Sequence, residues 1–196
     1  MGRFNGIVVP PARPIIGQPE IEAVTRVINS GMLAQGPEVA AFEEEFASYV
    51  GAPHAIALNS GTSALHMALL CIGIGPGDEV IVPSFTFAAT ANVVKLVGAE
   101  PVFVDIDPDT YCMSVSAAEA VITPRTRAIM PVHLYGHPAA VDQLAELASR
   151  NNIHLVEDAA QAHGATLNGK AVGTWGATSA FSFYPTKNMT SGEGGM

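Results

Sequence analysis

Short β-rich apolar runs alternate with helix-like segments between residues 79 and 158, and this alternation constrains the fold more than any other feature. The runs are "EVIVP", "PVFVDI", "RAIMPVHL" and "IHLVED", and the segments between them are "FAATANVVKLVG", "SAAEAVI" and "AAVDQLAELASRN". Strands that alternate with helices indicate βαβ units. Continuous apolar stretches such as "VIVP" are typical of strands buried on both faces. We therefore predict an α/β domain whose mostly parallel sheet is covered by helices on both faces.

The flanking segments predict further elements. Three helices are expected before residue 79, in "QPEIEAVTRVIN", "PEVAAFEEEFASYV" and "GTSALHMALLCIG", and the run "HAIALN" before the third of them predicts a short strand. The apolar residues of the first helix recur at helical spacing, and Gly51 suits the C-cap of the second. After residue 160, a small hairpin is expected around Asn168-Gly169, and "ATSAFSF" predicts a further strand.

Two local details complete this prediction. Ser116 and Glu119 have the spacing of a capping box at the start of the helix in "SAAEAVI". Cys71 lies inside an apolar helical pattern, so we expect it in the core. With Cys112 it is one of only two cysteines, which do not make a disulfide framework.

Composition limits the class of protein and its partners. A chain of 196 residues, 48% of them hydrophobic, is long enough for one domain with a sizeable core. A formal net charge of −9 argues against a nucleic-acid partner, because phosphate binding needs a basic face. The most apolar stretch, "ALHMALLCIGIG", is too short to span a membrane, and the first residues lack the apolar region of a signal peptide. We therefore expect a cytoplasmic protein with no membrane partner.

Polar residues follow three predicted strands, where ligands gather in doubly wound folds. In "NSGTSALHMAL" a tight turn leads into a helix whose first N–H groups could hold a phosphate or carboxylate, although an ordinary helix cap by Ser60 or Thr62 is the plainer alternative. Glu157 and Asp158 end the run "IHLVED", where an acid serves catalysis or merely caps the next segment. Lys187 follows the apolar "AFSFYP"; a loop lysine in water is the plainer alternative to a reactive amine.

Taken together, these three features match the needs of pyridoxal 5'-phosphate (PLP). Its phosphate needs N–H donors, its pyridinium nitrogen needs an anionic partner, and its aldehyde needs an amine. An aromatic side chain for the face of the ring is available in "PSFTFAATAN", again just after a strand. The combination therefore favours a PLP site over three unrelated local features.

Other motifs fit known sites less well. "IGIGPGDEV" follows a helix and precedes a strand, the reverse of a dinucleotide fingerprint. "DIDPDT" begins like a calcium loop, but Thr110 stands where that loop needs glycine. His133 and His137 are four apart, yet Gly136 and Pro138 argue against a helical metal pair. We therefore expect no metal site.

The motifs of the chain resemble those of PLP-dependent nucleotide-sugar aminotransferases of the DegT/StrS type. The resemblance runs almost from end to end and covers "SGMLAQGPEVAAFEEEFASYVGA", "NSGTSALHMAL", "GDEVIVPSFTFAATANVV", "GAEPVFVDIDPDT", "PVHLYGHPA", "VEDAAQAHGA" and "FSFYPTKNMTSGEGG". So long and ordered a combination is far more specific than any one motif. It implies the large domain of the fold-type I PLP-dependent transferases.

The resemblance also implies roles for individual residues. Lys187 stands at the position of the Schiff-base lysine, and Asp158 at that of the acid that pairs with the pyridine nitrogen. Gln161 matches the polar residue beside the ring, and Phe87 the aromatic that stacks on it. The phosphate contacts match Gly61, Thr62 and Ser182. His163 and Glu193 lie in typical segments of the family but receive no role.

The implied activity is transfer of an amino group from glutamate or glutamine to a keto-sugar carried on a nucleoside diphosphate, in a homodimer with active sites at the subunit interface. Relatives with histidine in place of the lysine are dehydratases or deoxygenases, so Lys187 favours transamination. Members of the family continue for about as long again, and we therefore expect residues 1–196 to be the N-terminal part and incomplete large domain, without the small C-terminal domain. A non-catalytic or truncated inactive protein, or another PLP reaction on the same fold, is the alternative.

Overall fold

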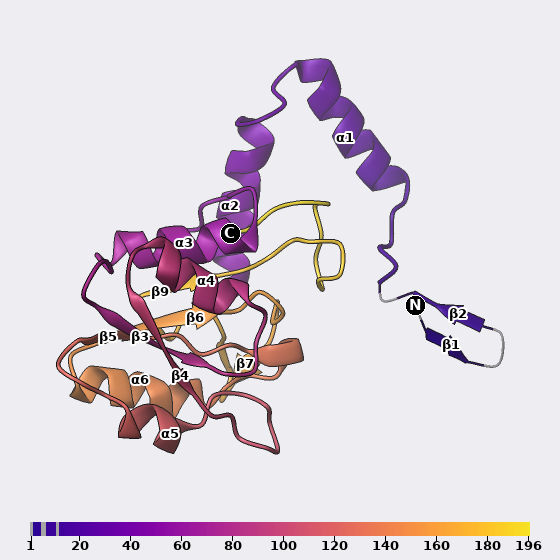
Figure 1. Cartoon of the computed structure of the whole chain (residues 1–196). Coiled ribbons are helices and arrows are strands. Elements are labelled where there is room, and N and C mark those ends of the chain that lie inside the picture. The colour runs from indigo at the N-terminus through magenta and orange to yellow at the C-terminus, as the bar shows by residue number, and fades with distance from the viewer. Residues whose placement is uncertain (1, 5–6, 11) are drawn as a thin grey trace.

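The computed structural model describes residues 2–4, 7–10 and 12–196, and a five-stranded sheet forms its centre (Figure 1). The strands lie in the order β4 (Glu100–Val104), β3 (Glu79–Pro83), β5 (Thr126–Ile129), β6 (His154–Asp158) and β9 (Thr178–Ala180). Each neighbouring pair is parallel. The predicted α/β class with a mostly parallel sheet is therefore confirmed.

Helices cover both faces of this sheet, as Figure 1 shows. On one face, α3 (Gly61–Cys71) and α4 (Ala89–Leu96) pack on a cluster that includes Val80 and Val82. On the other face, α6 (Val141–Arg150) packs on Ile81 and Ile129, and α5 (Val115–Ala120) lies beside it. Successive strand residues point to opposite faces, so the unbroken apolar runs are explained by cover on both sides.

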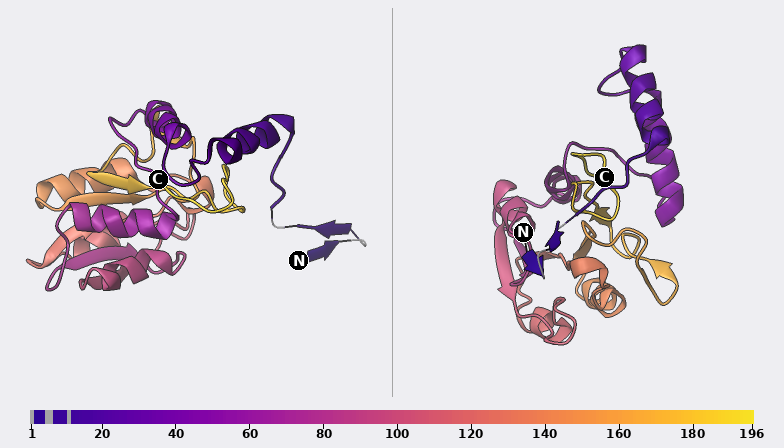
Figure 2. Two further views of the ribbon diagram at one scale, coloured as in Figure 1. Left: turned by 90° about the horizontal axis from the view of Figure 1, so that it is seen from above. Right: turned by 90° about the vertical axis from the view of Figure 1, so that its right-hand side faces the viewer.

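The N-terminal segment projects from this body (Figure 2). It contains the antiparallel pair β1 (Gly2–Phe4) and β2 (Ile7–Val9), followed by α1 (Gln18–Ser30) and α2 (Pro37–Val50). The end of α2 packs through Phe46 and Val50 into a third apolar cluster. The apolar stripe of α1, in contrast, is exposed along its length.

The hairpin predicted around Asn168-Gly169 is confirmed as β7 (Thr166–Leu167) and β8 (Lys170–Ala171), which pair antiparallel. Both turn residues have positive φ, 52° and 77°, which is the geometry that Asn-Gly favours in two-residue turns.

Four expectations are corrected. "HAIALN" forms no strand and contributes one isolated bridge, from Leu58 to Gly195, because no neighbouring strand lies along the rest of it. The cap of α5 is Ser114, which accepts from the N–H of Ala117, and not a box of Ser116 and Glu119. Cys71 is exposed, because it lies on the outer side of α3. The run "RAIMPVHL" is a regular strand only as far as Ile129; its backbone then stays beside β6 through a parallel bridge from Val132 to Asp158, and the run passes into the 3-10 turn η1 (Leu134–Gly136).

None of the helices within the described residues is long and apolar enough to cross a membrane. The cytoplasmic location expected from the sequence stays a prediction.

Candidate active site

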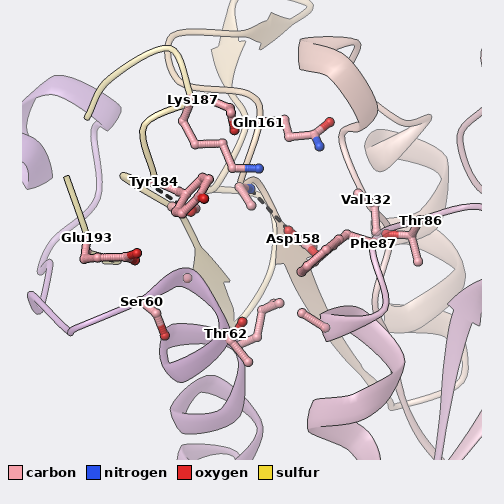
Figure 3. Close-up of a pocket in the computed structure, with 17 residues that line it drawn as sticks. Ser60, Thr62, Thr86, Phe87, Val132, Asp158, Gln161, Tyr184, Lys187 and Glu193 are labelled. Carbon is pink, nitrogen blue, oxygen red and sulfur yellow. Dashed lines mark hydrogen bonds between the residues drawn. The ribbon is translucent and has the colours of Figure 1, made fainter. Parts of the chain in front are cut away.

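A cavity of about 540 Å³ lies at the carboxyl ends of the central strands, where the sequence places its polar residues (Figure 3). All the predicted site residues line it: Gly61, Thr62, Phe87, Asp158, Gln161, Ser182 and Lys187. They come from segments far apart in the chain, so their convergence is a property of the fold. Their individual roles remain predictions.

The first turn of α3 forms one wall of the cavity. Ser60 is the N-cap of this helix, and its hydroxyl accepts from the N–H of Ser63 at 3.0 Å. The N–H groups of Gly61 and Thr62 have no acceptor among the described residues. The cap by Ser60 is therefore confirmed, whereas binding of an anion by the two free N–H groups at the positive end of the helix stays a prediction.

Gly61 is required by the close approach of another segment. A Cβ added at Gly61 would lie 2.7 Å from the Cβ of Ser182, which real Cβ atoms do not tolerate. This contact brings the Ser182 hydroxyl beside the start of α3. The backbone at Gly195 closes the same corner through bridges to Leu58 and Ser182. The wall is thus a helix start held between two later segments.

Asp158 ends β6 with its carboxylate directed into the cavity (Figure 3). Its Oδ2 accepts from the Thr90 hydroxyl at 2.9 Å, and its Oδ1 from the N–H of Ala160 at 3.2 Å. Its own N–H donates to Pro131, and its carbonyl accepts from His133. Burial raises the pKa of this carboxyl, and the hydrogen bond from Thr90 opposes that rise.

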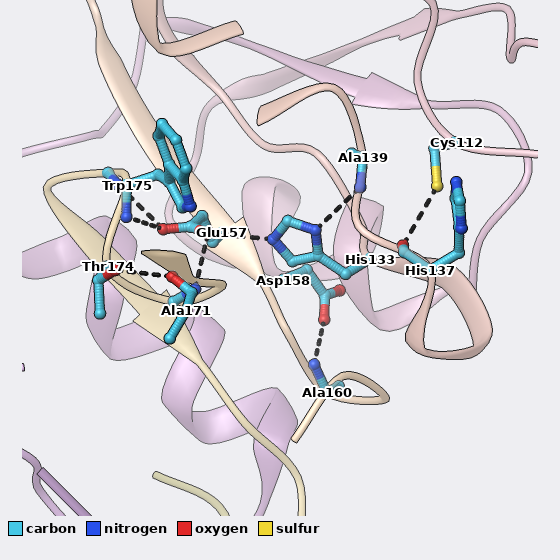
Figure 4. A network of polar contacts seen from close by, with 12 residues as sticks. Cys112, His133, His137, Ala139, Glu157, Asp158, Ala160, Ala171, Thr174 and Trp175 are labelled. Atoms are coloured by element: carbon cyan, nitrogen blue, oxygen red, sulfur yellow. Dashed lines mark hydrogen bonds and ion pairs between the residues drawn. The ribbon is translucent and has the colours of Figure 1, made fainter. Parts of the chain in front are cut away.

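Glu157, the neighbouring acid, points to the other side of the strand and has a structural role (Figure 4). Its carboxylate is fully buried and accepts from the N–H groups of Gly173, Trp175 and Gly176, and it is 3.1 Å from the Nε2 of His133. The Nδ1 of His133 accepts from the N–H of Ala139, so Nε2 carries the ring proton and donates to Glu157. Only Asp158 is left to face a ligand.

Lys187 enters the cavity from the segment after β9, and Figure 3 shows its side chain directed toward Asp158 at the end of β6. A turn in which its N–H donates to the carbonyl of Tyr184 fixes the backbone there. Partial burial lowers the pKa of the Lys187 amine, and the Asp158 carboxylate opposes this shift. The amine is therefore easier to deprotonate than a surface lysine.

Phe87 and Gln161 lie on the rim. The Phe87 ring is 73% exposed, so one face stays available to a planar ligand. Gln161 accepts through Oε1 from the N–H of Tyr135 at 2.7 Å. Tyr135 has a left-handed backbone with φ of 52°, uncommon for a residue with a side chain, and this hydrogen bond helps to hold it.

Several lining residues were not predicted from the sequence. Thr86, Tyr184 and Glu193 line the cavity, and Thr90 lies beneath it against Asp158. Thr86 and Thr90 occur in "PSFTFAATAN", the same strand end that indicates Phe87, so their hydroxyls were a usable signal. No group of three or more His, Cys, Asp or Glu side chains in the described part of the chain could hold a metal ion.

Comparison with known proteins assigns the chain to a family. Residues 14–196 match the model of the DegT/DnrJ/EryC1/StrS aminotransferase family. The chain belongs to this family. The DegT/DnrJ/EryC1/StrS resemblance seen in the sequence motifs is therefore confirmed across most of its length.

Two curated members of the DegT/DnrJ/EryC1/StrS family illustrate the similarity. GDP-perosamine synthase of Caulobacter vibrioides is 55% identical over 161 residues, 82% of this chain and 43% of that protein. The dTDP-3-amino-3,4,6-trideoxy-alpha-D-glucose transaminase of Streptomyces venezuelae is 52% identical over 174 residues, 88% of this chain and 46% of that protein. The chain spans about half the length of the curated relatives that it matches.

A solved structure gives the same result for the fold. The PLP form of a protein from Streptococcus pneumoniae, classed as a sugar aminotransferase, superposes with a TM-score of 0.92 at 36% identity. The match covers 95% of this chain and 52% of that one. Fold-type I architecture is therefore confirmed for the described chain.

Proposed function

We propose that the chain is the PLP-binding part of an aminotransferase that moves an amino group onto a nucleotide-linked keto-sugar. One observation supports this most: an anion-binding helix start, a buried carboxylate and a lysine with a lowered pKa line a single cavity. Family membership supports the reaction class, and the names of two relatives, one a GDP-sugar synthase and one a dTDP-sugar transaminase, support the substrate class.

The helix-start wall fits the phosphate of PLP. The N–H groups of Gly61 and Thr62 and the hydroxyl of Ser182 are donors on one side of the cavity, and the positive end of α3 favours an anion there. Because Gly61 has no side chain, the segment around Ser182 approaches closely enough for both segments to contact one phosphate group.

The opposite end fits the ring and the aldehyde. The Asp158 carboxylate faces the cavity from beneath, and the exposed Phe87 ring lies at its rim. When bound, PLP supplies a carbonyl that reacts with amines and a ring that withdraws electrons. The ionised Asp158 Oδ2 would hold the proton of the ring nitrogen, and the neutral Lys187 Nζ would accept and return a proton at the reacting carbon.

The cofactor assignment is tested by titrating the purified chain with PLP. We expect a visible absorbance band, and after borohydride reduction and proteolysis the mass of the reduced cofactor should lie on the peptide that contains Lys187. Lys187→Ala should lose both signals, whereas Lys95→Ala, a surface lysine paired with Glu100, should keep them. A band that survives in Lys187→Ala would show that the assignment is wrong.

The donor, assembly and location are proposed on the family resemblance: glutamate or glutamine as donor, a homodimer, and a cytoplasmic protein. We also propose that residues 1–196 are the N-terminal part and large domain of a longer protein, since they span about half of the relatives. Incubation with glutamate and a dTDP- or GDP-linked keto-sugar tests the reaction. Formation of an amino-sugar nucleotide is expected, and turnover of glutamate by decarboxylation instead would contradict it.

A further inference from the structure

Beside Asp158, a buried polar residue that does not line the cavity lies directly beneath it. Thr90, in α4, is fully buried, and its hydroxyl donates to Asp158 Oδ2 at 2.9 Å. The Thr86 hydroxyl lies 2.9 Å from that of Thr90. Thr86 itself lines the cavity (Figure 3), so a chain of two hydroxyl groups connects the rim to the carboxylate.

The donor and acceptor of each hydrogen bond between Thr86, Thr90 and Asp158 follow from the number of protons that these groups carry. An ionised carboxylate only accepts hydrogen bonds, and a threonine hydroxyl has a single proton to donate. Thr90 gives its proton to Asp158, so in the contact with Thr86 it must accept. The arrangement is therefore Thr86 to Thr90 to Asp158, with every proton directed toward the acid.

Two hydrogen bonds are the main support for a charge on this carboxylate, and the nearby His133 and Lys187 lower its pKa to a smaller extent. Oδ1 has the N–H of Ala160, and Oδ2 has the hydroxyl of Thr90. Against these stands complete burial, which raises the pKa of Asp158. Hydrogen bonds to an ion are roughly twice as strong as those between neutral groups, so loss of one donor shifts this balance.

We propose that Thr90 is a positioning residue that keeps Asp158 ionised and directed at the ring nitrogen of the cofactor, and that Thr86 supports it through the second hydroxyl. This inference rests on the proposed function, because the cationic ring of PLP is the group that would need such a carboxylate.

The test compares two cofactors in Thr90→Val, which keeps the shape of the side chain and removes only the hydroxyl. Affinities are measured for PLP and for an analogue with carbon in place of the ring nitrogen, which has no proton for Asp158 to hold. We expect PLP to bind about tenfold more weakly, as for loss of one hydrogen bond to a charged group, and the analogue to change less than about twofold. Thr90→Ser, which restores a hydroxyl, should bring PLP affinity back to within about threefold.

Thr178→Val is the matched control, because the Thr178 hydroxyl oxygen is buried without a hydrogen-bond partner among the described residues. It should leave both affinities unchanged. If Thr90→Val does not fold, Thr86→Val is tested with the same two cofactors. We expect its affinity for PLP to fall about threefold and its affinity for the analogue to stay unchanged.

Two results would overturn the inference: an equal loss for both cofactors, which indicates a packing role only, or unchanged PLP affinity in Thr90→Val. If the unsubstituted protein binds no PLP through Lys187, the proposed function itself fails and the inference fails with it. PLP binding through Lys187 in the unsubstituted protein therefore distinguishes failure of the inference from failure of the proposed function.

Discussion

At the scale of single residues, Gly61 shows how one missing side chain fixes the site. Gly61→Ala places a methyl group 2.7 Å from the Ser182 Cβ, so either α3 or the segment after β9 must move. We expect a loss of about 1–3 kcal/mol in unfolding free energy and weaker PLP binding. Chemical denaturation and cofactor titration measure both effects.

The control for this substitution is Gly75→Ala. A Cβ there meets only the carbonyl of Val97, at 3.9 Å, so neither stability nor PLP affinity should fall. Equal behaviour of the two variants would contradict the close-approach argument.

His163 gives the chain a predictable response to acid. Its ring lies among Phe46, Phe181 and Phe183, and neither ring nitrogen has a hydrogen-bond partner within the described residues. Burial lowers its pKa to about 4 from the usual 6.5. Between these values the unfolded chain binds the proton more readily, so the stability present above pH 6.5 is lost as the pH falls toward 4.

We therefore expect the unfolding free energy of His163→Leu to fall less steeply as the pH drops below 6.5, with a change in slope of at most about 1.4 kcal/mol per pH unit. Thermal unfolding between pH 4 and 7 measures the slope. His54→Leu is the comparison, since His54 is exposed and its loss should leave the limb intact. An unchanged slope in His163→Leu would show that another group titrates.

At the scale of secondary structure, Glu157 joins β6 to the segment before β9. Its carboxylate accepts hydrogen bonds from three backbone N–H groups and from His133. In Glu157→Gln the buried side-chain NH2 group, itself a donor, would face some of these donors. We expect a loss of about 3 kcal/mol in unfolding free energy. Urea denaturation checks this, with Glu45→Gln, at an exposed position of α2, expected to stay within about 0.5 kcal/mol. A loss below 1 kcal/mol for Glu157→Gln would be inconsistent with this network.

Elements with a strong local pattern were predictable from the sequence. The run "EVIVP" predicted β3 to the residue, and the stripe of Ile21, Val24 and Ile28 predicted α1, because apolar periodicity reports burial or amphipathic shape directly. "HAIALN" has the same composition as a strand but lacks a neighbour to pair with, which is information from the whole fold. Ser114 and Ser116 are both capable caps, and backbone geometry decided between them.

The site was predictable where residue type alone restricts the chemistry. A lone lysine after an apolar strand and an acid at a strand end pointed to Lys187 and Asp158, and both line the cavity. Thr90 was missed because its importance lies in a contact with a residue 68 positions away. The closeness of Gly61 and Ser182 is likewise a tertiary property that no local pattern encodes.

At the scale of the whole molecule, α1 leaves an apolar stripe of Ile21, Val24 and Ile28 in contact with solvent. Exposed amphipathic faces of this kind are typical of association surfaces. We expect the chain to self-associate, and replacement of all three residues by serine to weaken association at least about tenfold, the cost of losing three apolar contacts. Sedimentation velocity over a range of concentrations measures this.

The same triple variant should keep its unfolding free energy to within about 1 kcal/mol, because none of the three side chains is buried in the single chain. A purely monomeric chain at every concentration, or association that survives the substitutions, would contradict a role for this stripe.

The closure of the corner at Leu58, Ser182 and Gly195 also has a kinetic consequence. These contacts join the segment just before α3 to segments far along the chain, so the cavity wall at the start of α3 exists only when these distant segments have come together. Contacts between such distant segments form late, after the entropy of a long loop has been lost. A cofactor held at this corner binds the finished molecule and none of its precursors. Binding of the cofactor should therefore slow unfolding and extend the lifetime of the native state, and the folding rate should stay unchanged.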